Sequence, residues 1–288
     1  MFFVIVLAVS SLVNFALPQD SSSFTYNGFR SANLSLDGVA TFTGDDLLRL
    51  TNATKQKQNH AFYPDQIKFK NSSNGSAYSF STMFVFTMIY EYPPLGALPS
   101  YYFGLFNESN NGNSSNHIVA VEFDTIQNHE FLVINDNHVG IDVNWLSSVK
   151  SVPAGYSASP GEVFTNFSQM SDKAMQVWVD YDGSQKQFNV TCAPTNVEKP
   201  KTPLLSLSID LSPIIKETMY VGFSSSTGSL VTSHYIVGWS FKVNGQAQRL
   251  VLSKLPRLPH VRKEEKSYLL IIGVPFKLLL LGKSLMMF

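Results

Sequence analysis

The chain has only one cysteine, few charged residues and almost no helical periodicity. A single cysteine, Cys192, excludes a disulfide within the chain, and a domain of this size can bury a sufficient core without one. Cys192 alternates with Val190 in FNVTCAP, which predicts a buried structural thiol. Charged residues make up 15% of the chain, with 21 of each sign. This balance provides no excess of basic residues, so nucleic-acid binding is not predicted.

The N-terminal segment contains no basic residue, although it is apolar from Met1 to about Ala16. Polar Gln19 and Asp20 follow, so we predict that residues 1–20 are a secretory signal peptide without the usual basic start. A buried first strand is the alternative for the same residues. Asn-x-Ser/Thr sequons support export, since they are the acceptors of N-glycosylation. Glycosylation is predicted at Asn33, Asn52, Asn71, Asn74, Asn107, Asn113, Asn166 and Asn189.

The C-terminal tail contains no uninterrupted apolar run long enough to cross a membrane. Tyr268 to Phe288 just reaches the ~20 residues that a span needs, but Lys277 and Lys283 interrupt it. We interpret residues 260–288 as a charged linker and a truncated hydrophobic tail, with weak or absent anchoring. The chain also has no Gly-rich loop, catalytic-loop or Asp-Phe-Gly motif of a protein kinase.

Short runs rich in aromatic and β-branched residues alternate with turn residues along the chain. Ala77 to Tyr90 is the most strand-like, and the Asp182-Gly183 turn joins strands predicted at 175–182 and 186–192. Many short strands predict a single all-β, two-sheet antiparallel sandwich. Trp178 and Trp239 lie in apolar strands and are predicted core residues.

The remaining segments outside residues 118–144 have weaker strand patterns. Strands are predicted at 24–29, 39–50 (two strands), 61–69, 101–106, 204–209, 219–224, 233–244 and 248–253. Loops are predicted at 107–116 and 145–164, and one short helical turn at 213–217.

Two carboxylates lie at the centre of one predicted hairpin, IVAVEFDTIQNHEFLVINDNHVGIDVN, residues 118–144. Because side chains alternate along a strand, Glu122 and Asp124 share one face. Like charges this close repel unless a cation lies between them. Asn128, residues 135–137 and His138 follow, and oxygen ligands suit calcium whereas an imidazole suits manganese. From the residues alone, a polar hairpin without a metal is equally acceptable.

VEFDTIQN followed by INDNHVGIDVN resembles the metal-binding segment of the legume-type (L-type) lectins. The resemblance runs from Phe24 to about Pro259 and is strongest to the ectodomain of plant L-type lectin receptor kinases. It also includes GLFNESNNGNSSNH, MQVWVDYDG, MYVGFSSSTGS and HYIVGWSF, in that order.

This resemblance implies a concanavalin-like jelly roll, with a lectin domain at residues 21–259. It implies a protein of the secretory pathway, secreted or at the plasma membrane. Glycans or glycoproteins are the expected partners, and a homodimer could form through a sandwich sheet. By the same resemblance, Glu122, Asp124 and His138 hold manganese. Asp124, the carbonyl of Ile126 and the side chain of Asn128 hold calcium, and Asn128 also contacts the sugar.

Two departures from the family pattern predict impaired metal and sugar binding. Val133 stands where the family has an aspartate that bridges both ions, so Glu122 and Asp124 supply a charge of −2 against +4 for two divalent ions. Asp136 offers a carboxylate at a different place in the loop. Related ectodomains also carry an apolar strand and a sugar-binding aspartate between their counterparts of Gly96 and Ala97, and this chain lacks both. Loss of a strand leaves its neighbours with unpaired backbone groups.

These residues are compatible with three functions. The favoured one is a lectin-like ectodomain, and the second is an interaction or decoy protein that has lost its ligand chemistry. A glycoside hydrolase of the same architecture is the third, but Ile126 stands at the third position of its carboxylate pattern. Such enzymes need two carboxyl groups flanking the scissile bond, so no enzymatic activity is predicted.

Overall fold

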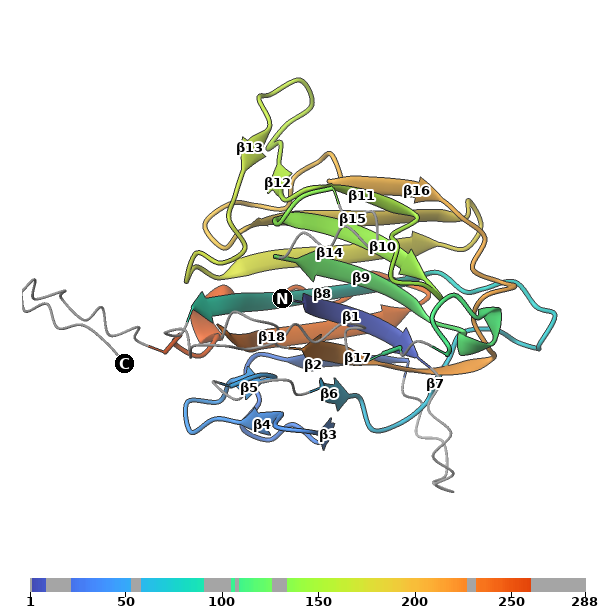
Figure 1. Ribbon diagram of the computed structural model, residues 1–288, viewed down its shortest axis with the longest axis horizontal. Helices are drawn as coiled ribbons and strands as arrows, with labels where there is room; N and C mark the ends of the chain where they lie inside the picture. Colours follow the sequence, from blue (N-terminus) through green and yellow to red (C-terminus); the bar gives the residue numbers. More distant parts are fainter. Residues whose placement is uncertain are drawn as a thin grey trace, which may run out of the picture.

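Two antiparallel β-sheets form the protein, as the computed structural model shows (Figure 1). The structure describes residues 2–8, 22–52, 58–90, 105–106, 109–125, 134–226 and 232–259. Every strand pair in both sheets is antiparallel, which confirms the predicted all-β sandwich.

The first sheet has eight strands, and one end of it carries the candidate site. Its order is β11 (Lys150–Pro153), β10 (His138–Val143), β9 (Val119–Asp124), β1 (Phe2–Ala8), β17 (Thr218–Ser226), β6 (Gln58–Phe62) and β3 (Ser35–Asp37). The short strand β7 (Ile67–Lys68) also pairs with β17.

The second sheet also has eight strands and packs against the first. Its order is β16 (Leu205–Ser208), β15 (Gln187–Pro194), β14 (Met175–Asp182), β8 (Phe80–Tyr90), β18 (Thr232–Val243), β5 (Leu48–Arg49) and β4 (Thr41–Phe42), and β2 (Ser23–Tyr26) pairs with β18. A separate small ladder joins β12 (Gly155–Tyr156) to β13 (Thr165–Asn166), and two 3₁₀ turns lie at Ser114–Asn116 and Leu252–Lys254.

Aromatic side chains from both sheets form the core. The ring of Phe123 in β9 lies 5.0 Å from that of Phe86 in β8, and the ring of Phe223 in β17 lies 4.7 Å from that of Trp239 in β18. Burial of each such side chain stabilises the fold by roughly 1.5–3 kcal/mol. Trp239 is fully buried in this core, and Trp178, 7% exposed, is buried in a second, smaller hydrophobic cluster on the outer face of the second sheet. Both tryptophans are thus buried as predicted. Cys192 is buried as predicted, and burial raises the pKa of its thiol.

Several predicted segments differ in detail. Residues 248–253 do not form a strand, because Leu250 packs with Val85, Trp178 and Val237 on the outer face of the second sheet instead of extending its edge. Part of the loop predicted at 145–164 forms β11 and β12, since β11 pairs with β10. The short helical turn predicted at 213–217 lies at 212–214, where the backbone N–H of Ile215 donates to the carbonyl of Leu211. Most of the strand predicted at 101–106 lies outside the described residues.

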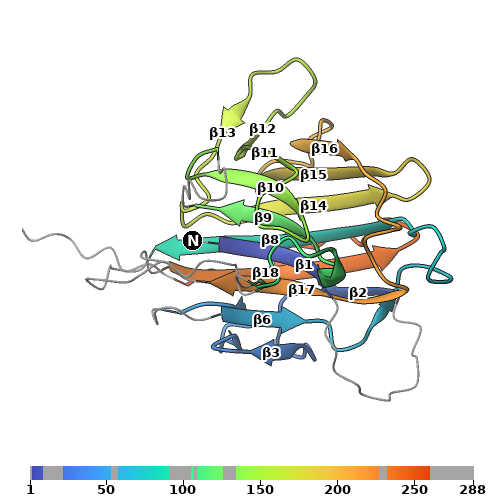
Figure 2. The same ribbon diagram turned by 45° about the vertical axis from the view of Figure 1, so that its right-hand side comes forward.

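The apolar N-terminus forms a strand at the middle of the first sheet. Figure 2 shows β1 in dark blue between β9 and β17. This arrangement corresponds to the strand alternative for these residues, and cleavage of residues 1–20 on export stays a prediction. Residues 260–288 lie outside the described part, and no helix within that part is long and apolar enough to cross a membrane.

Candidate metal centre

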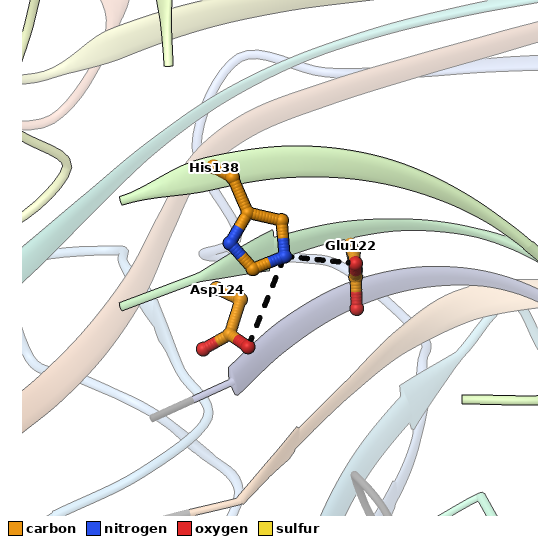
Figure 3. A group of neighbouring side chains, drawn as sticks. All are labelled: Glu122, Asp124 and His138. Atoms are coloured by element: carbon orange, nitrogen blue, oxygen red, sulfur yellow. Dashed lines mark hydrogen bonds and ion pairs between the residues drawn. The ribbon is translucent and has the colours of Figure 1, made fainter. Parts of the chain in front are cut away.

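The register between β9 and β10 brings three predicted ligands together. His138 lies opposite Asp124, and Gly140 lies opposite Glu122. Residues directly opposite each other in an antiparallel pair share a face, so both carboxylates and the imidazole point the same way (Figure 3). One ligand atom from each of the three side chains lies within 4.8 Å of the other two. On the other face, Val119, Val121 and Phe123 enter the core as predicted.

The imidazole of His138 is oriented so that one nitrogen faces both carboxylates. Its Nε2 lies 3.1 Å from Glu122 Oε1 and 4.0 Å from Asp124 Oδ2. Its Nδ1 lies 2.9 Å from the carbonyl oxygen of Asn135, which can only accept, so Nδ1 carries a proton. Such a contact fixes the tautomer of a ligating histidine and leaves the Nε2 lone pair of the neutral ring directed at the site.

All three side chains are buried, with exposed fractions of 2% or less. Burial by itself lowers the pKa of His138. The hydrogen bond with Glu122 and the negative charges of Glu122 and Asp124 outweigh burial, and the pKa of His138 is raised. The site therefore favours a positive charge at Nε2, which either a proton or a cation can supply.

Gln169 and Asn137 hold the ends of β9 and β10 in place. The Gln169 side-chain amide donates to the backbone carbonyls of Asp124, at 3.1 Å, and of His138, at 2.8 Å. The Asn137 side chain accepts from the backbone N–H of Gln169 and donates to the carbonyl of Phe167. Sequence reasoning missed Gln169, because it belongs to a distant loop and has no local pattern.

A third carboxylate, Asp142, lies beside the cluster on the same face of β10. The hydroxyl of Ser148 lies 2.7 Å from Asp142 Oδ1 and also contacts Glu122 Oε1. Burial and the charge of Glu122 raise the pKa of Asp142 well above its usual range, which favours the neutral acid. A Cβ on Gly140 would collide with Ser148 and Glu122, so this strand position requires glycine. The two-residue spacing of His138, Gly140 and Asp142 could have revealed this third carboxylate.

The side chains present fit one transition-type divalent cation. Two carboxylates and one imidazole nitrogen suit manganese, and their charge of −2 balances a single divalent ion. The exposed Asp136 is not one of the three clustered residues. The predicted calcium and sugar ligands Ile126 and Asn128, and the substituted Val133, lie outside the described residues, as does the junction between Gly96 and Ala97.

The structure shows how exposed the asparagines of the predicted glycosylation sites are to solvent. Asn107 lies outside the described residues. Asn52 and Asn189 are half-buried, and the exposed sites are Asn33, Asn71, Asn74, Asn113 and Asn166. None of the described sites is buried, so glycosylation stays a prediction that the fold permits.

Comparison with known proteins gives consistent matches over the described domain. A family model described as the legume lectin domain matches residues 21–257. The chain is 49% identical over 271 residues to the L-type lectin-domain containing receptor kinase IV.2 of Arabidopsis thaliana. That match covers 88% of this chain and 40% of the relative, so the chain spans about two fifths of the relative's length.

Solved structures match the same region. Lectin UEA-II complexed with galactose has a TM-score of 0.61 and 25% identity, and the match covers 79% of this chain and 100% of that one. Lectin I-B4 from Griffonia simplicifolia, in its metal-free form, has a TM-score of 0.63 and 27% identity. This second match covers 78% of this chain and 100% of that one.

Proposed function

Because this chain belongs to the legume lectin family, we propose that it binds glycans or glycoproteins, without enzymatic activity, through a metal-dependent site. The observation that carries this proposal is the buried group of Glu122, Asp124 and His138, which presents two carboxylates and one imidazole nitrogen together. The galactose complex of a structurally similar lectin supports a sugar as the ligand class.

A manganese-type ion held by these three residues would supply positive charge that fixes the ends of β9 and β10. Neighbouring residues of the chain already hold the strand ends and the His138 imidazole in position. Gln169 bonds to the backbone of both strands at Asp124 and His138, and Asn135 sets the tautomer of His138. Residues 125–137 join these two strand ends, and they contain the calcium ligands Ile126 and Asn128 proposed by resemblance. The proposed calcium and sugar site therefore depends on a cation that balances the charges of Glu122 and Asp124 at these strand ends.

We expect metal and sugar binding to be weaker than in lectins with the complete ligand set. Val133 provides no oxygen where the family places its bridging aspartate, and attraction of hard cations depends on charged oxygens. The segment missing between Gly96 and Ala97 removes the sugar-binding aspartate. Asn128 remains the proposed sugar contact.

A location at the cell surface or outside the cell also belongs to this proposal. The curated relative in Arabidopsis thaliana is a receptor kinase, and this chain matches 40% of its length. Eight sequons and exposed asparagines at most described sites support passage through the secretory pathway.

A homodimer through a sandwich sheet stays a proposal.

A decoy or interaction protein is the alternative function, since the chain lacks parts of the family's sugar site. The two functions are separated by a glycan array probed with the purified chain, with calcium and manganese or with chelator. The proposed lectin binds weakly, and chelator removes the binding. A Glu122→Gln variant, which keeps the side-chain shape but loses a charge, should behave like the chelated protein. Absence of binding to every glycan with both ions present would favour the decoy, and binding insensitive to chelator would exclude a metal-dependent site.

A further inference from the structure

The ladder of β12 and β13 forms a small sheet of its own, beside the two large ones, and carries one predicted glycan acceptor (Figure 1). Asn166 in β13 lies directly opposite Gly155 in β12. Asn166 is exposed, and its sequon continues through Phe167 and Ser168. Because Phe167 packs against the main core, strand alternation directs Asn166 away from it. The acceptor side chain is therefore presented to solvent on the outer face of this hairpin.

The aromatic ring of Phe164 lies on the same face of the hairpin, beside Asn166. Phe164 comes directly before β13 and two residues ahead of Asn166, so alternation directs both side chains to one face. A Cβ added to Gly155 would collide with the Phe164 ring and with the carbonyl of Thr165. The ring thus covers Gly155, at the position directly across the ladder from Asn166.

The surface of this ring suits the apolar face of a sugar. Although the Phe164 ring lies against Gly155, the residue is still 42% exposed. The face of an aromatic ring is electronegative and attracts weakly positive hydrogens. Axial C–H groups line one face of N-acetylglucosamine, the sugar that is joined directly to asparagine in an N-glycan. The exposed ring therefore matches the first sugar of a glycan attached to its own neighbour.

We propose that the Phe164 ring is a binding surface for the first N-acetylglucosamine of an N-glycan on Asn166. The glycan is transferred from a lipid-linked oligosaccharide. Its C1 forms a bond with Asn166 Nδ2, which loses one proton, and the lipid pyrophosphate leaves. The attached sugar then covers the ring and becomes part of the packing of the hairpin. This role rests on the passage through the secretory pathway proposed above, and it is independent of sugar binding at the metal centre.

The covered hairpin also supports the candidate metal centre. The backbone N–H of Phe167 donates to the carbonyl of Ala154, and the N–H of Ala154 donates to the carbonyl of Asn137. Asn137 directly precedes the proposed ligand His138. A glycan that orders the hairpin therefore restrains the backbone next to this ligand.

The first test detects the contact between ring and sugar directly. The full chain is exported from cells that make high-mannose glycans with ¹³C-labelled sugars, and an endoglycosidase trims each glycan to one N-acetylglucosamine. Comparison with Asn166→Gln assigns the nuclear magnetic resonance signals of the Asn166 sugar. Ring currents should shift these signals away from those of the other attached sugars. Phe164→Leu keeps an apolar side chain without a ring and should abolish the shift. Val163→Ala alters the adjacent apolar residue, which alternation places on the other face, and should leave the shift unchanged.

Amide hydrogen exchange tests the effect on the hairpin. In the unaltered chain, the single sugar on Asn166 should slow exchange in β12 and β13 by roughly two- to tenfold relative to Asn166→Gln. In Phe164→Leu, the same loss of the sugar should change exchange little, so the two substitutions should not be additive.

Three outcomes would overturn the proposal. The first is a set of Asn166 sugar signals that is the same in Phe164→Leu as in the unaltered chain. The second is an equal effect of the sugar on exchange with and without the ring. The third is an Asn166 that carries no glycan. Absence of the glycan at Asn166 alone would leave export intact, whereas absence at every sequon would contradict export as well.

Discussion

His138 Nε2 lies 3.1 Å from Glu122 Oε1 at a fully buried position on the first sheet. Because Nδ1 already bonds to the Asn135 carbonyl, Nε2 is the nitrogen available to the carboxylates. Glu122 and Asp124 together raise the pKa of His138 against the opposing effect of burial. A proton and a divalent cation therefore compete for the same nitrogen, which couples metal binding to proton release.

The three buried carboxylates next to His138 should differ in their effect on metal binding. Glu122→Gln removes a charged ligand oxygen and should weaken manganese binding by more than roughly tenfold. Asp142→Asn replaces a carboxyl whose raised pKa favours the neutral acid, so its effect should be much smaller. Titration calorimetry on both variants and on the unaltered chain measures the difference. Equal losses would mean that Asp142 is itself a ligand and that the proposed set of three is incomplete.

Restoring the missing aspartate should strengthen the site. We expect Val133→Asp to raise calcium and manganese affinity, because it adds a charged oxygen where the family places its bridging ligand. Sugar binding should not return, since the segment missing between Gly96 and Ala97 is still absent. Leu132→Asp adds the same charge one residue away and is the matched control in calorimetry. No gain from Val133→Asp, or an equal gain from Leu132→Asp, would show that the assumed alignment of this loop is wrong.

The ligand cluster could be predicted from the sequence because it depends on strand periodicity and one short hairpin. Glu122 and Asp124 share a face by alternation, and the pairing of β9 with β10 brings His138 opposite Asp124. Gln169 could not be predicted, because only tertiary folding brings its loop to the ends of both strands.

Strands are harder to predict from sequence where the same apolar run is compatible with more than one structure. Phe2–Ala8 is apolar enough for a signal peptide or for a central strand, and local pattern does not distinguish the two. The pattern around Leu250 predicts a strand, yet Leu250 covers the outer face of the second sheet near Trp178. Burial of an apolar side chain does not by itself require that its backbone join a ladder.

The buried indole of Trp239 should contribute more to stability than its hydrophobic area alone. Its Nε1 donates to Thr82 Oγ1 at 3.0 Å, and that hydroxyl donates to the carbonyl of Ser240 at 2.7 Å. Trp239→Phe leaves a small cavity and removes the hydrogen bond to Thr82. It should therefore cost roughly 1–3 kcal/mol in the free energy of unfolding. Trp145→Phe, at a side chain that is 52% exposed, should stay within about 0.5 kcal/mol. Similar losses in denaturant unfolding for both variants would contradict a specific role for Trp239.

Stability should fall in mild acid because His234 is buried in its neutral form. Its Nδ1 lies 2.5 Å from Ser225 Oγ and its Nε2 lies 2.9 Å from Thr232 Oγ1. Burial lowers the pKa of His234 from 6.5 to about 3. Between these values the unfolded chain binds a proton at this histidine and the folded chain does not. The contribution of His234 to stability is thus complete above pH 6.5 and is lost as the pH falls toward 3, by up to ~1.4 kcal/mol per pH unit.

His234→Asn isolates this effect, since asparagine does not titrate and still offers a donor and an acceptor to the two hydroxyls. The variant should be less stable at neutral pH, because its smaller side chain fills the buried site less well. Its free energy of unfolding should nevertheless fall less steeply than that of the unaltered chain between pH 6.5 and 4. The carboxylates and the other histidines titrate in both proteins, so their contributions cancel in the difference between the two free energies of unfolding. Parallel curves in denaturant unfolding across this range would mean that His234 takes up its proton in the folded chain near its ordinary pKa, and that the buried neutral histidine does not account for the acid sensitivity.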